Sequence, residues 1–560
     1  MTPSRIDIIV TSNDTTARRG ADHLVDGLKT LGLNTVYSLS GNQIMPVYDA
    51  LIGAGLRLIH VRHEAAAVHM AEADAQLTDR VGVALLTAGP GFANGLSAMW
   101  DAAQSQTPLI ILTGDAPVSR DGHGAFQEMN QQAAAATFAK ASVKLERAED
   151  AYDLIRDAAA FARAGTPGPV HISLPDDILR KTVNRSGAHH NPTLTADEPD
   201  TAQPVAAIAD QIRSAKRPLI IAGPAFARQA HEKALADHAK AANVPILALE
   251  SPRGLRAPRI GALAEILPEA DLIVTLSLTP NFLLGFGEAP TIAETARFIC
   301  CTDDVAALAR TRARLGADRV EVVSLSGQRA FSAWTNGPDA LLNQPSANVE
   351  DGWRTKVEDA VAFRPGAWST IEASAPPFHA AAIMGAIKPF LADNPQTTLT
   401  IDGGEIGQWG QAILDAEFAL INGPSGAIGG SIPYAIAAKT ARPDAPSIAI
   451  LGDGTAGFHF MEYETAIREE LSFVAIIGND AKWNAEYQIQ VRDYGENRTF
   501  GCEMAPTRYD EIVRAMGGYG EHVTDISELR PAIERALASG LPACIDVPLE
   551  SNPAPLIRRT

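Results

Sequence analysis

The chain has 560 residues, 46% of them hydrophobic and 20% charged, and carries a formal net charge of −19 at pH 7. That charge argues against nucleic acid or an anionic membrane as a partner, and no apolar run reaches the roughly 18 residues of a membrane-spanning helix. Four scattered cysteines, and no apolar segment of signal-peptide length after Met1, favour a reducing compartment, so we expect a cytoplasmic protein.

Strand-like apolar runs alternate with helix-like segments along the chain, a pattern typical of parallel α/β domains. Two polar, proline-rich stretches interrupt the alternation, at about residues 183–204 and 335–377. We therefore predict an α/β protein with three doubly wound parallel-sheet domains. They are expected over residues 1–185, 200–340 and 375–560.

The first domain places polar residues after several predicted strands. Residues 40–43, ending in Gln43, follow the strand 36–39, and residues 124–128 lie in a loop after the strand 109–114. Residues 61–72 follow a short strand and are strongly helix-forming, so Glu64 is expected at a strand-to-helix junction. A glutamate at a helix start is also favoured by the helix dipole alone. A zinc-protease motif is excluded because no histidine lies four positions after His63.

The central domain is expected to be Rossmann-like, with strands near residues 218–222, 244–249 and 271–276. No Gly-x-Gly-x-x-Gly follows its first strand, so a bound dinucleotide is not indicated. Arg253, Arg256 and Arg259 lie close together in the sequence and would suit phosphate binding. A solvated arginine face is the other interpretation of the same pattern.

The third domain carries the most informative pattern. The apolar run 448–451 predicts a buried strand that ends at Asp453, and the run 473–477 predicts a second strand that ends at Asn479 and Asp480. The segment between them, residues 458–470, has helical composition. Parallel strands joined by a helix would bring Asp453 and Asp480 to one sheet edge, where their oxygens suit Mg²⁺. The alternative is an ordinary Asp-Gly turn.

The outer two domains repeat one another weakly. Residues 81–92 parallel residues 447–458, and each domain closes on a proline-flanked strand, at 169–175 and 542–548. Two related domains, or merely a shared α/β pattern, would both give this likeness.

Together these motifs resemble the thiamine-diphosphate (ThDP) enzymes of the acetolactate synthase, benzaldehyde lyase and 2-hydroxyacyl-CoA lyase superfamily. The resemblance implies a pyrimidine-binding first domain and a diphosphate-binding third domain. In the third domain it implies that Mg²⁺ is bound by Asp453, Asp480 and the Lys482 backbone carbonyl. Asp480 departs from the asparagine usual at that position, but it is still an oxygen ligand. The cofactor is then expected to contact Gly426, Ile428, Gly452, Asp453, Gly454 and Thr455.

Individual roles also follow from the resemblance. The stretch Arg62-His63-Glu64 resembles the family's glutamate motif, which implies that Glu64 hydrogen-bonds the pyrimidine nitrogen N1′ and activates the cofactor. Gly426 is expected to accept a hydrogen bond from the aminopyrimidine, and Ile428 to separate the two rings. Gln43 and Gln127 are the expected substrate-orienting, catalytic amides. The substrate pocket is expected to include His123, Phe126 and Trp483.

The implied activity is a ThDP- and Mg²⁺-dependent carbon–carbon lyase or carboligase that acts on 2-oxo acids or 2-hydroxy ketones through a C2 carbanion and an enamine. A 2-hydroxyacyl-CoA lyase, an acetolactate-synthase-like enzyme and, from a different class, a non-catalytic ThDP-fold sensor or regulatory subunit are the alternatives. FAD or ADP in the central domain is possible but not indicated. We expect a homodimer or homotetramer with sites at the subunit interface.

Overall fold

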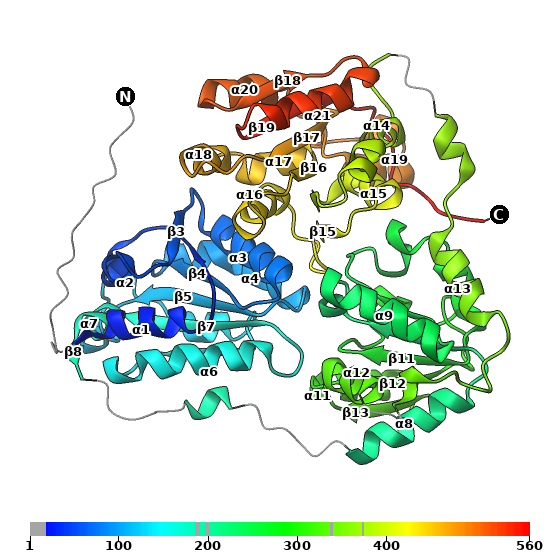
Figure 1. Cartoon of the computed structure of the whole chain (residues 1–560), viewed down its shortest axis with the longest axis horizontal. Coiled ribbons are helices and arrows are strands. Elements are labelled where there is room, and N and C mark those ends of the chain that lie inside the picture. Colours follow the sequence, from blue (N-terminus) through cyan, green and yellow to red (C-terminus); the bar gives the residue numbers. More distant parts are fainter. Residues whose placement is uncertain (1–17, 185–190, 196–201, 337–339, 372–374, 560) are drawn as a thin grey trace.

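The computed structural model describes residues 18–184, 191–195, 202–336, 340–371 and 375–559. It contains three parallel sheets with helices packed around them (Figure 1). The N-terminal sheet (blue to cyan) lies beside the central one (green), and the C-terminal sheet (yellow to red) lies above both in this view. The predicted fold class of three parallel α/β units is confirmed. The expected linker residues 185–190 and 196–201 lie outside the described residues.

The N-terminal sheet has the strand order β3-β2-β4-β5-β7-β6, and all its strands are parallel. The strands are β2 (Thr35–Ser38), β3 (Arg57–His60), β4 (Gly82–Leu86), β5 (Leu109–Asp115), β6 (Ala141–Lys144) and β7 (Pro169–Pro175). The helices are α1 (Gly20–Lys29), α2 (Met45–Leu51), α3 (Glu64–Thr78), α4 (Pro90–Gln104), α5 (Gln131–Ala135), α6 (Ala151–Arg163) and α7 (Asp176–Arg180). A short antiparallel pair joins β1 (Arg18–Arg19) to β8 (Thr182–Val183).

The central sheet has the order β10-β9-β11-β12-β13, a doubly wound arrangement in which the first strand lies inside the sheet. Its strands are β9 (Pro218–Ala222), β10 (Ile246–Ala248), β11 (Leu272–Leu276), β12 (Arg297–Thr302) and β13 (Val320–Ser324). Its helices are α8 (Ala202–Ser214), α9 (Gln229–Ala242), α10 (Leu263–Ile266), α11 (Val305–Leu315), α12 (Gly327–Thr335) and α13 (Trp353–Ala362).

The C-terminal sheet has the order β15-β14-β16-β17-β19-β18. Its strands are β14 (Thr398–Ile401), β15 (Phe418–Ile421), β16 (Ser447–Gly452), β17 (Val474–Asn479), β18 (Tyr519–His522) and β19 (Ala543–Pro548). Its helices are α14 (Ala380–Asp393), α15 (Gly404–Ile413), α16 (Ser431–Ala441), α17 (Asp453–His459), α18 (Glu462–Arg468), α19 (Asn484–Tyr494), α20 (Tyr509–Met516) and α21 (Leu529–Ala538). Counted within each domain, the strands follow the same order as in the N-terminal sheet, so the weak sequence repeat corresponds to a repeated topology.

The two outer domains share one hydrophobic core through α3 and α16. Alanine-rich α3 packs closely on α16, and buried residues of both helices belong to a single cluster. The hydroxyl of Tyr434 on α16 lies 2.9 Å from Glu72 Oε2 and 3.1 Å from Asp101 Oδ2 in the N-terminal domain. This contact fixes the C-terminal sheet relative to the N-terminal one.

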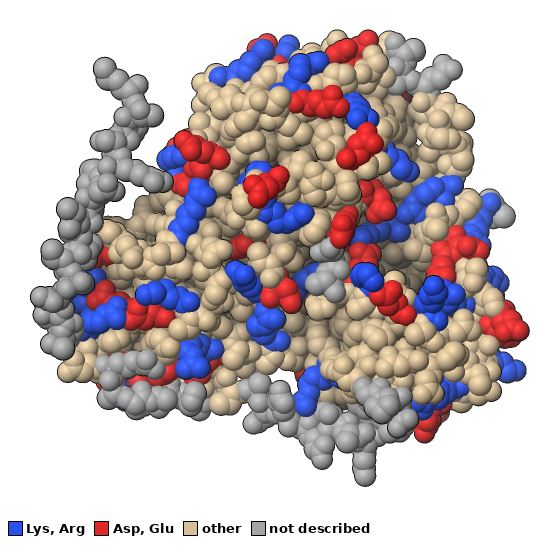
Figure 2. Space-filling view, in the orientation of Figure 1, with Lys and Arg blue, Asp and Glu red and all other residues tan. Residues whose placement is uncertain are grey.

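Two local expectations need correction. The connection at residues 335–377, expected to be rich in loops, contains helix α13, which buries Trp353, Val357 and Ala360 at helical spacing. The helical segment expected at 458–470 is two helices, α17 and α18, because the first begins directly at Asp453. No helix in the described part of the chain is long and apolar enough to cross a membrane. On the face in Figure 2, basic and acidic side chains are interspersed.

Candidate active site

Two residues expected to bind the metal, Asp453 and Asp480, lie at the carboxyl edge of the C-terminal sheet. β16 and β17 are parallel neighbours in which Gly452 pairs with Gly478. Asp453 and Asp480 therefore follow their strands at the same edge, as predicted, and both border a cavity of about 160 Å³. The cavity is also lined by Ile428, Gly454, Thr455, Lys482 and Trp483.

The two aspartates form an electrostatically unfavourable pair without a cation. Asp453 Oδ2 and Asp480 Oδ2 are buried and lack a hydrogen-bond partner. Burial, and then the neighbouring charge of Asp480, raise the pKa of Asp453 to about 7. Burial also raises the pKa of Asp480. A divalent cation would neutralise both groups and satisfy their free oxygens, and two carboxylates suit Mg²⁺.

Glycines give the pocket its shape. A Cβ on Gly403 would lie 2.8 Å from Ile428 Cγ2, and a Cβ on Gly454 would lie 2.9 Å from the ring of Trp483. Both distances are too short for a real side chain, so glycine at these positions lets Ile428 and Trp483 reach the cavity. Gly426 adopts φ +72°, a conformation that favours glycine.

The segment that carries Gly426 and Ile428 is held at both ends. The buried Asp402 carboxylate accepts hydrogen bonds from the backbone N–H groups of Gly429 and Ser431, each at 3.0 Å. The Ser425 hydroxyl donates to Asp101 of the N-terminal domain. Ile428 is therefore presented to the cavity by a fixed loop rather than by a free one.

Glu64 lies where the sequence predicted, at a strand-to-helix junction. β3 ends at His60 and Glu64 is the first residue of α3. Its side chain is buried, and its Oε2 accepts a hydrogen bond of 2.9 Å from Asn94 Nδ2 on α4. A Cβ on Gly91 would lie 3.2 Å from Glu64 Oε1, so the start of α4 packs closely against this carboxyl group.

The two predicted substrate-facing glutamines are joined by a hydrogen bond. Gln43 Nε2 donates to Gln127 Oε1 at 3.0 Å, and Thr87 donates to Gln43 Oε1 at 2.9 Å. The loop that carries Gln127 also carries His123 and Phe126, and both side chains are exposed, Phe126 by 71%.

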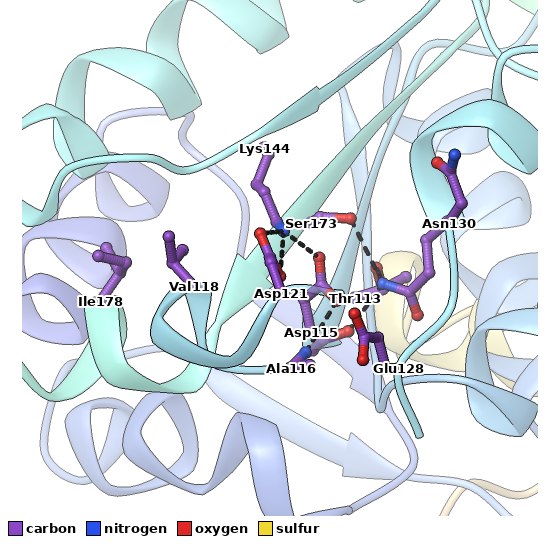
Figure 3. Close-up of polar contacts among 12 residues, drawn as sticks. Thr113, Asp115, Ala116, Val118, Asp121, Glu128, Asn130, Lys144, Ser173 and Ile178 are labelled. Carbon is purple, nitrogen blue, oxygen red and sulfur yellow. Dashed lines mark hydrogen bonds and ion pairs between the residues drawn. The ribbon is translucent and has the colours of Figure 1, made fainter. Parts of the chain in front are cut away.

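This loop is anchored to the sheet on both sides (Figure 3). Lys144 Nζ lies 3.0 Å from Asp121 Oδ2 and 3.3 Å from Asp115 Oδ2. On the other side the buried amide of Gln131 donates to the Gly114 carbonyl at 2.9 Å, and its Oε1 accepts from Gly89 N at 3.0 Å. These contacts fix the two ends of the segment that presents Gln127.

Within one chain the predicted residues form two groups. Glu64, Gln43 and Gln127 belong to the N-terminal domain and do not border the cavity beside Asp453. Large apolar side chains are exposed on the loop of the first group, on helices α17 and α19 of the C-terminal domain, and between α17 and α18. They are Phe126, Met129, Phe458, Met461, Ile489 and Tyr494.

Two acidic residues of the pocket, Glu405 and Glu486, were not predicted from the sequence. Glu405 follows β14, the strand beside β16, so the strand-edge argument that found Asp453 also applies to it. Burial raises the pKa of Glu405. Glu486 lies in the first turn of α19, three residues after the predicted pocket residue Trp483.

Another buried carboxyl group, that of Glu462, connects the C-terminal domain to the turn before Glu64. Its Oε1 accepts hydrogen bonds from the backbone N–H groups of Arg62 and His63, at 3.0 and 3.1 Å. Burial raises its pKa from 4.5 to about 7. Glu462 thus holds the strand-to-helix junction at which Glu64 lies.

Glu462 should make the protein less stable as pH rises. Because its pKa is higher in the folded state, the folded protein binds more protons than the unfolded chain between pH 4.5 and about 7. The free energy of unfolding should therefore fall by about 3 kcal/mol across this window, relative to Glu462→Gln. Urea unfolding of both proteins at several pH values would measure the difference. Parallel pH profiles would contradict the assignment.

Comparisons with known proteins agree with the geometry. Residues 18–134 match the family described as thiamine pyrophosphate enzyme, N-terminal TPP binding domain, and residues 402–547 match the corresponding C-terminal TPP binding domain. A probable acetolactate synthase of Mycobacterium bovis is 32% identical over 93% of this chain and 94% of its own length. The human 2-hydroxyacyl-CoA lyase 2 is 26% identical over 90% of this chain and 85% of its own. The Escherichia coli oxalyl-CoA decarboxylase is 26% identical over 95% of both.

Proposed function

Because the chain belongs to the thiamine-diphosphate-dependent enzymes of the acetolactate synthase and 2-hydroxyacyl-CoA lyase superfamily, we propose that it is a ThDP- and Mg²⁺-dependent lyase or carboligase. Its substrates would be 2-oxo acids or 2-hydroxy ketones. The observation that carries the proposal is the pair Asp453 and Asp480, which each have a buried oxygen without a hydrogen-bond partner and border one cavity with Ile428. Relatives of this chain are enzymes, which removes the alternative of a non-catalytic sensor.

The residues of the C-terminal pocket would hold the cofactor. Asp453, Asp480 and the Lys482 backbone carbonyl would bind Mg²⁺, with the diphosphate beside Gly452, Gly454 and Thr455. Ile428 would lie between the cofactor rings, and the Gly426 carbonyl would accept from the aminopyrimidine. When bound, ThDP supplies the carbon nucleophile that attacks a substrate carbonyl and the ring that accepts the electrons.

Glu64 would hold a proton at the pyrimidine nitrogen N1′. The carboxyl group is suited to this because it is buried and Asn94 orients one of its oxygens. The other oxygen, Oε1, would then face the cofactor. A proton shared at this atom is the contribution that the N-terminal domain makes to activation.

The two glutamines would orient the substrate. Gln43 donates to Gln127 Oε1, so the Gln127 Nε2 group keeps its donors for a substrate oxygen. Phe126 would form the wall of the pocket, with His123 and Trp483 at its border. Neither glutamine is anionic, so both would bind a carbonyl or hydroxyl oxygen without adding negative charge to the site.

A second copy of the chain would complete the site. The Glu64 group and the Asp453 cavity are separate within one chain, and exposed apolar residues accompany both. We therefore expect a homodimer or homotetramer, acting in the cytoplasm, in which Glu64 of one subunit serves the Asp453 pocket of its neighbour.

Mixing two inactive variants would test this arrangement. Glu64→Gln and Asp453→Ala should each be inactive alone, but co-expression should restore about a quarter of wild-type activity. The reason is that half of the dimers are hybrid and each hybrid has one intact site. Activity of hybrids isolated with two different affinity tags is the measurement. If the hybrids are as inactive as the parents, the two groups act within one chain.

The acyl-CoA alternative is favoured by relatives named 2-hydroxyacyl-CoA lyase 2. A screen of 2-oxo acids, 2-hydroxy ketones and 2-hydroxyacyl-CoA esters, with ThDP and Mg²⁺ supplied, separates the candidates. If the protein turns over only the CoA esters, its activity is that of a 2-hydroxyacyl-CoA lyase and the proposed substrates are wrong. Acetolactate formation from pyruvate would support acetolactate-synthase-like activity.

A further inference from the structure

The three arginines that stand out in the central-domain sequence have different surroundings. Arg259 is paired with Glu250 at 2.7 Å and with Glu232 at 3.0 Å, so it is already neutralised. Arg256 is exposed. Arg253 is paired with a carboxyl group of the C-terminal domain, since its Nη2 lies 3.4 Å from Glu405 Oε2.

That contact places Arg253 beside the cofactor pocket. Glu405 lines the cavity together with Asp453 and Ile428. The preceding residue, Pro252, packs against the loop that carries Ile428, because a Cβ on Gly426 would lie 3.8 Å from Pro252 Cβ. The central domain thus borders the active site through the segment that carries Arg253.

The charged residues that line the cavity are mostly acidic. Its lining includes the carboxylates of Asp453, Asp480, Glu405 and Glu486, against the single cation of Lys482. A bound Mg²⁺ would offset two of these charges, but the cofactor's diphosphate would add negative charge again. A substrate carboxylate entering this pocket would be repelled unless a free cation met it.

The guanidinium group of Arg253 has free donors with which it can bind a substrate carboxylate. A guanidinium group has five N–H donors, and in the described part of the chain that of Arg253 donates only to Glu405, over a long distance. Its side chain is 43% exposed, so the remaining donors are accessible. A planar guanidinium binds a carboxylate through two parallel hydrogen bonds.

We infer that Arg253 binds the carboxylate of the substrate and so selects 2-oxo acids over neutral 2-hydroxy ketones. This inference rests on the proposed function and names its substrate class. Glu405 holds the guanidinium at the pocket while no substrate is present. Arg253 would then be a specificity-determining residue contributed by a domain that otherwise takes no part in the site.

The test compares Arg253→Gln with Arg256→Gln, a matched control in the same segment. For Arg253→Gln the KM for pyruvate should rise about 10- to 100-fold, as expected for loss of a charged hydrogen-bond pair. The kcat, and the KM for the neutral ketone acetoin, should change by less than about twofold, because no contact to a neutral substrate is lost. Arg253→Lys should recover part of the effect, and Arg256→Gln should match the wild type.

Inhibition gives a second readout that does not depend on the substrate turned over. Propanoate and propanamide differ in charge but little in shape. Arg253→Gln should weaken inhibition by propanoate and leave that by propanamide unchanged. Equal weakening of both, or a rise in KM for acetoin equal to that for pyruvate, would show a structural role and overturn the inference. If the wild-type enzyme, supplied with ThDP and Mg²⁺, converts no carbonyl compound at all, the proposed function itself is wrong and the inference falls with it.

Discussion

Replacement of Glu64 by glutamine should lower kcat by about 10³-fold while ThDP still binds. Glutamine has nearly the same shape, and its amide can still pair with Asn94, so the start of α3 should be undisturbed. The amide cannot share a proton with the pyrimidine nitrogen, and this step is the proposed role of the carboxyl group. Steady-state kinetics and calorimetric titration with ThDP on the same sample measure the two effects separately.

Glu72→Gln is an informative companion to that experiment. Glu72 is a fully buried glutamate on the same helix, and it is bonded to Gln76 and Tyr434 instead of facing the pocket. Its replacement should affect stability more than kcat. A Glu64→Gln enzyme with nearly wild-type turnover would remove Glu64 from the catalytic scheme.

Replacement of Asp453 by alanine should weaken binding of the cofactor with its metal by at least about 100-fold, because a buried carboxylate ligand is lost. The stability of the folded protein should not decrease, because Asp453 repels Asp480 in the metal-free state. A thermal midpoint equal to or above that of the wild type would show that the loss of binding does not come from unfolding.

Asp480→Asn is the matched control for this effect. An amide oxygen can replace a carboxylate oxygen as a ligand, and the change also removes one of the two crowded charges. Mg²⁺-dependent ThDP binding should therefore survive in Asp480→Asn. Loss of binding in this variant would show that the charge of Asp480, and not merely its oxygen, is required.

The pocket on the C-terminal sheet could be predicted because its signals are local. A buried strand that ends in an aspartate, followed by a second strand that ends in Asn479 and Asp480, fixes a shared edge once the strands are parallel. Glu64 was placed for the same reason, since the helix-forming run begins directly after a short strand. Such features need only a few neighbouring residues.

Other features depend on contacts between distant segments and could not be predicted. The packing of α3 on α16, the bond from Glu462 to the turn before Glu64, and the pairing of Arg253 with Glu405 all join different domains. Helix α13 is different, because Trp353, Val357 and Ala360 show helical spacing in the sequence. The prolines in the flanking sequence led to the prediction of a loop, although the helical spacing is present in the sequence.

The most direct test of the account is a calorimetric titration of the purified protein with ThDP, in the presence and in the absence of Mg²⁺. We expect saturable binding that requires the cation, because the carboxylates of Asp453 and Asp480 would repel the diphosphate if Mg²⁺ did not lie between them. Absence of ThDP binding with Mg²⁺ present, or binding of equal strength without any divalent cation, would contradict it.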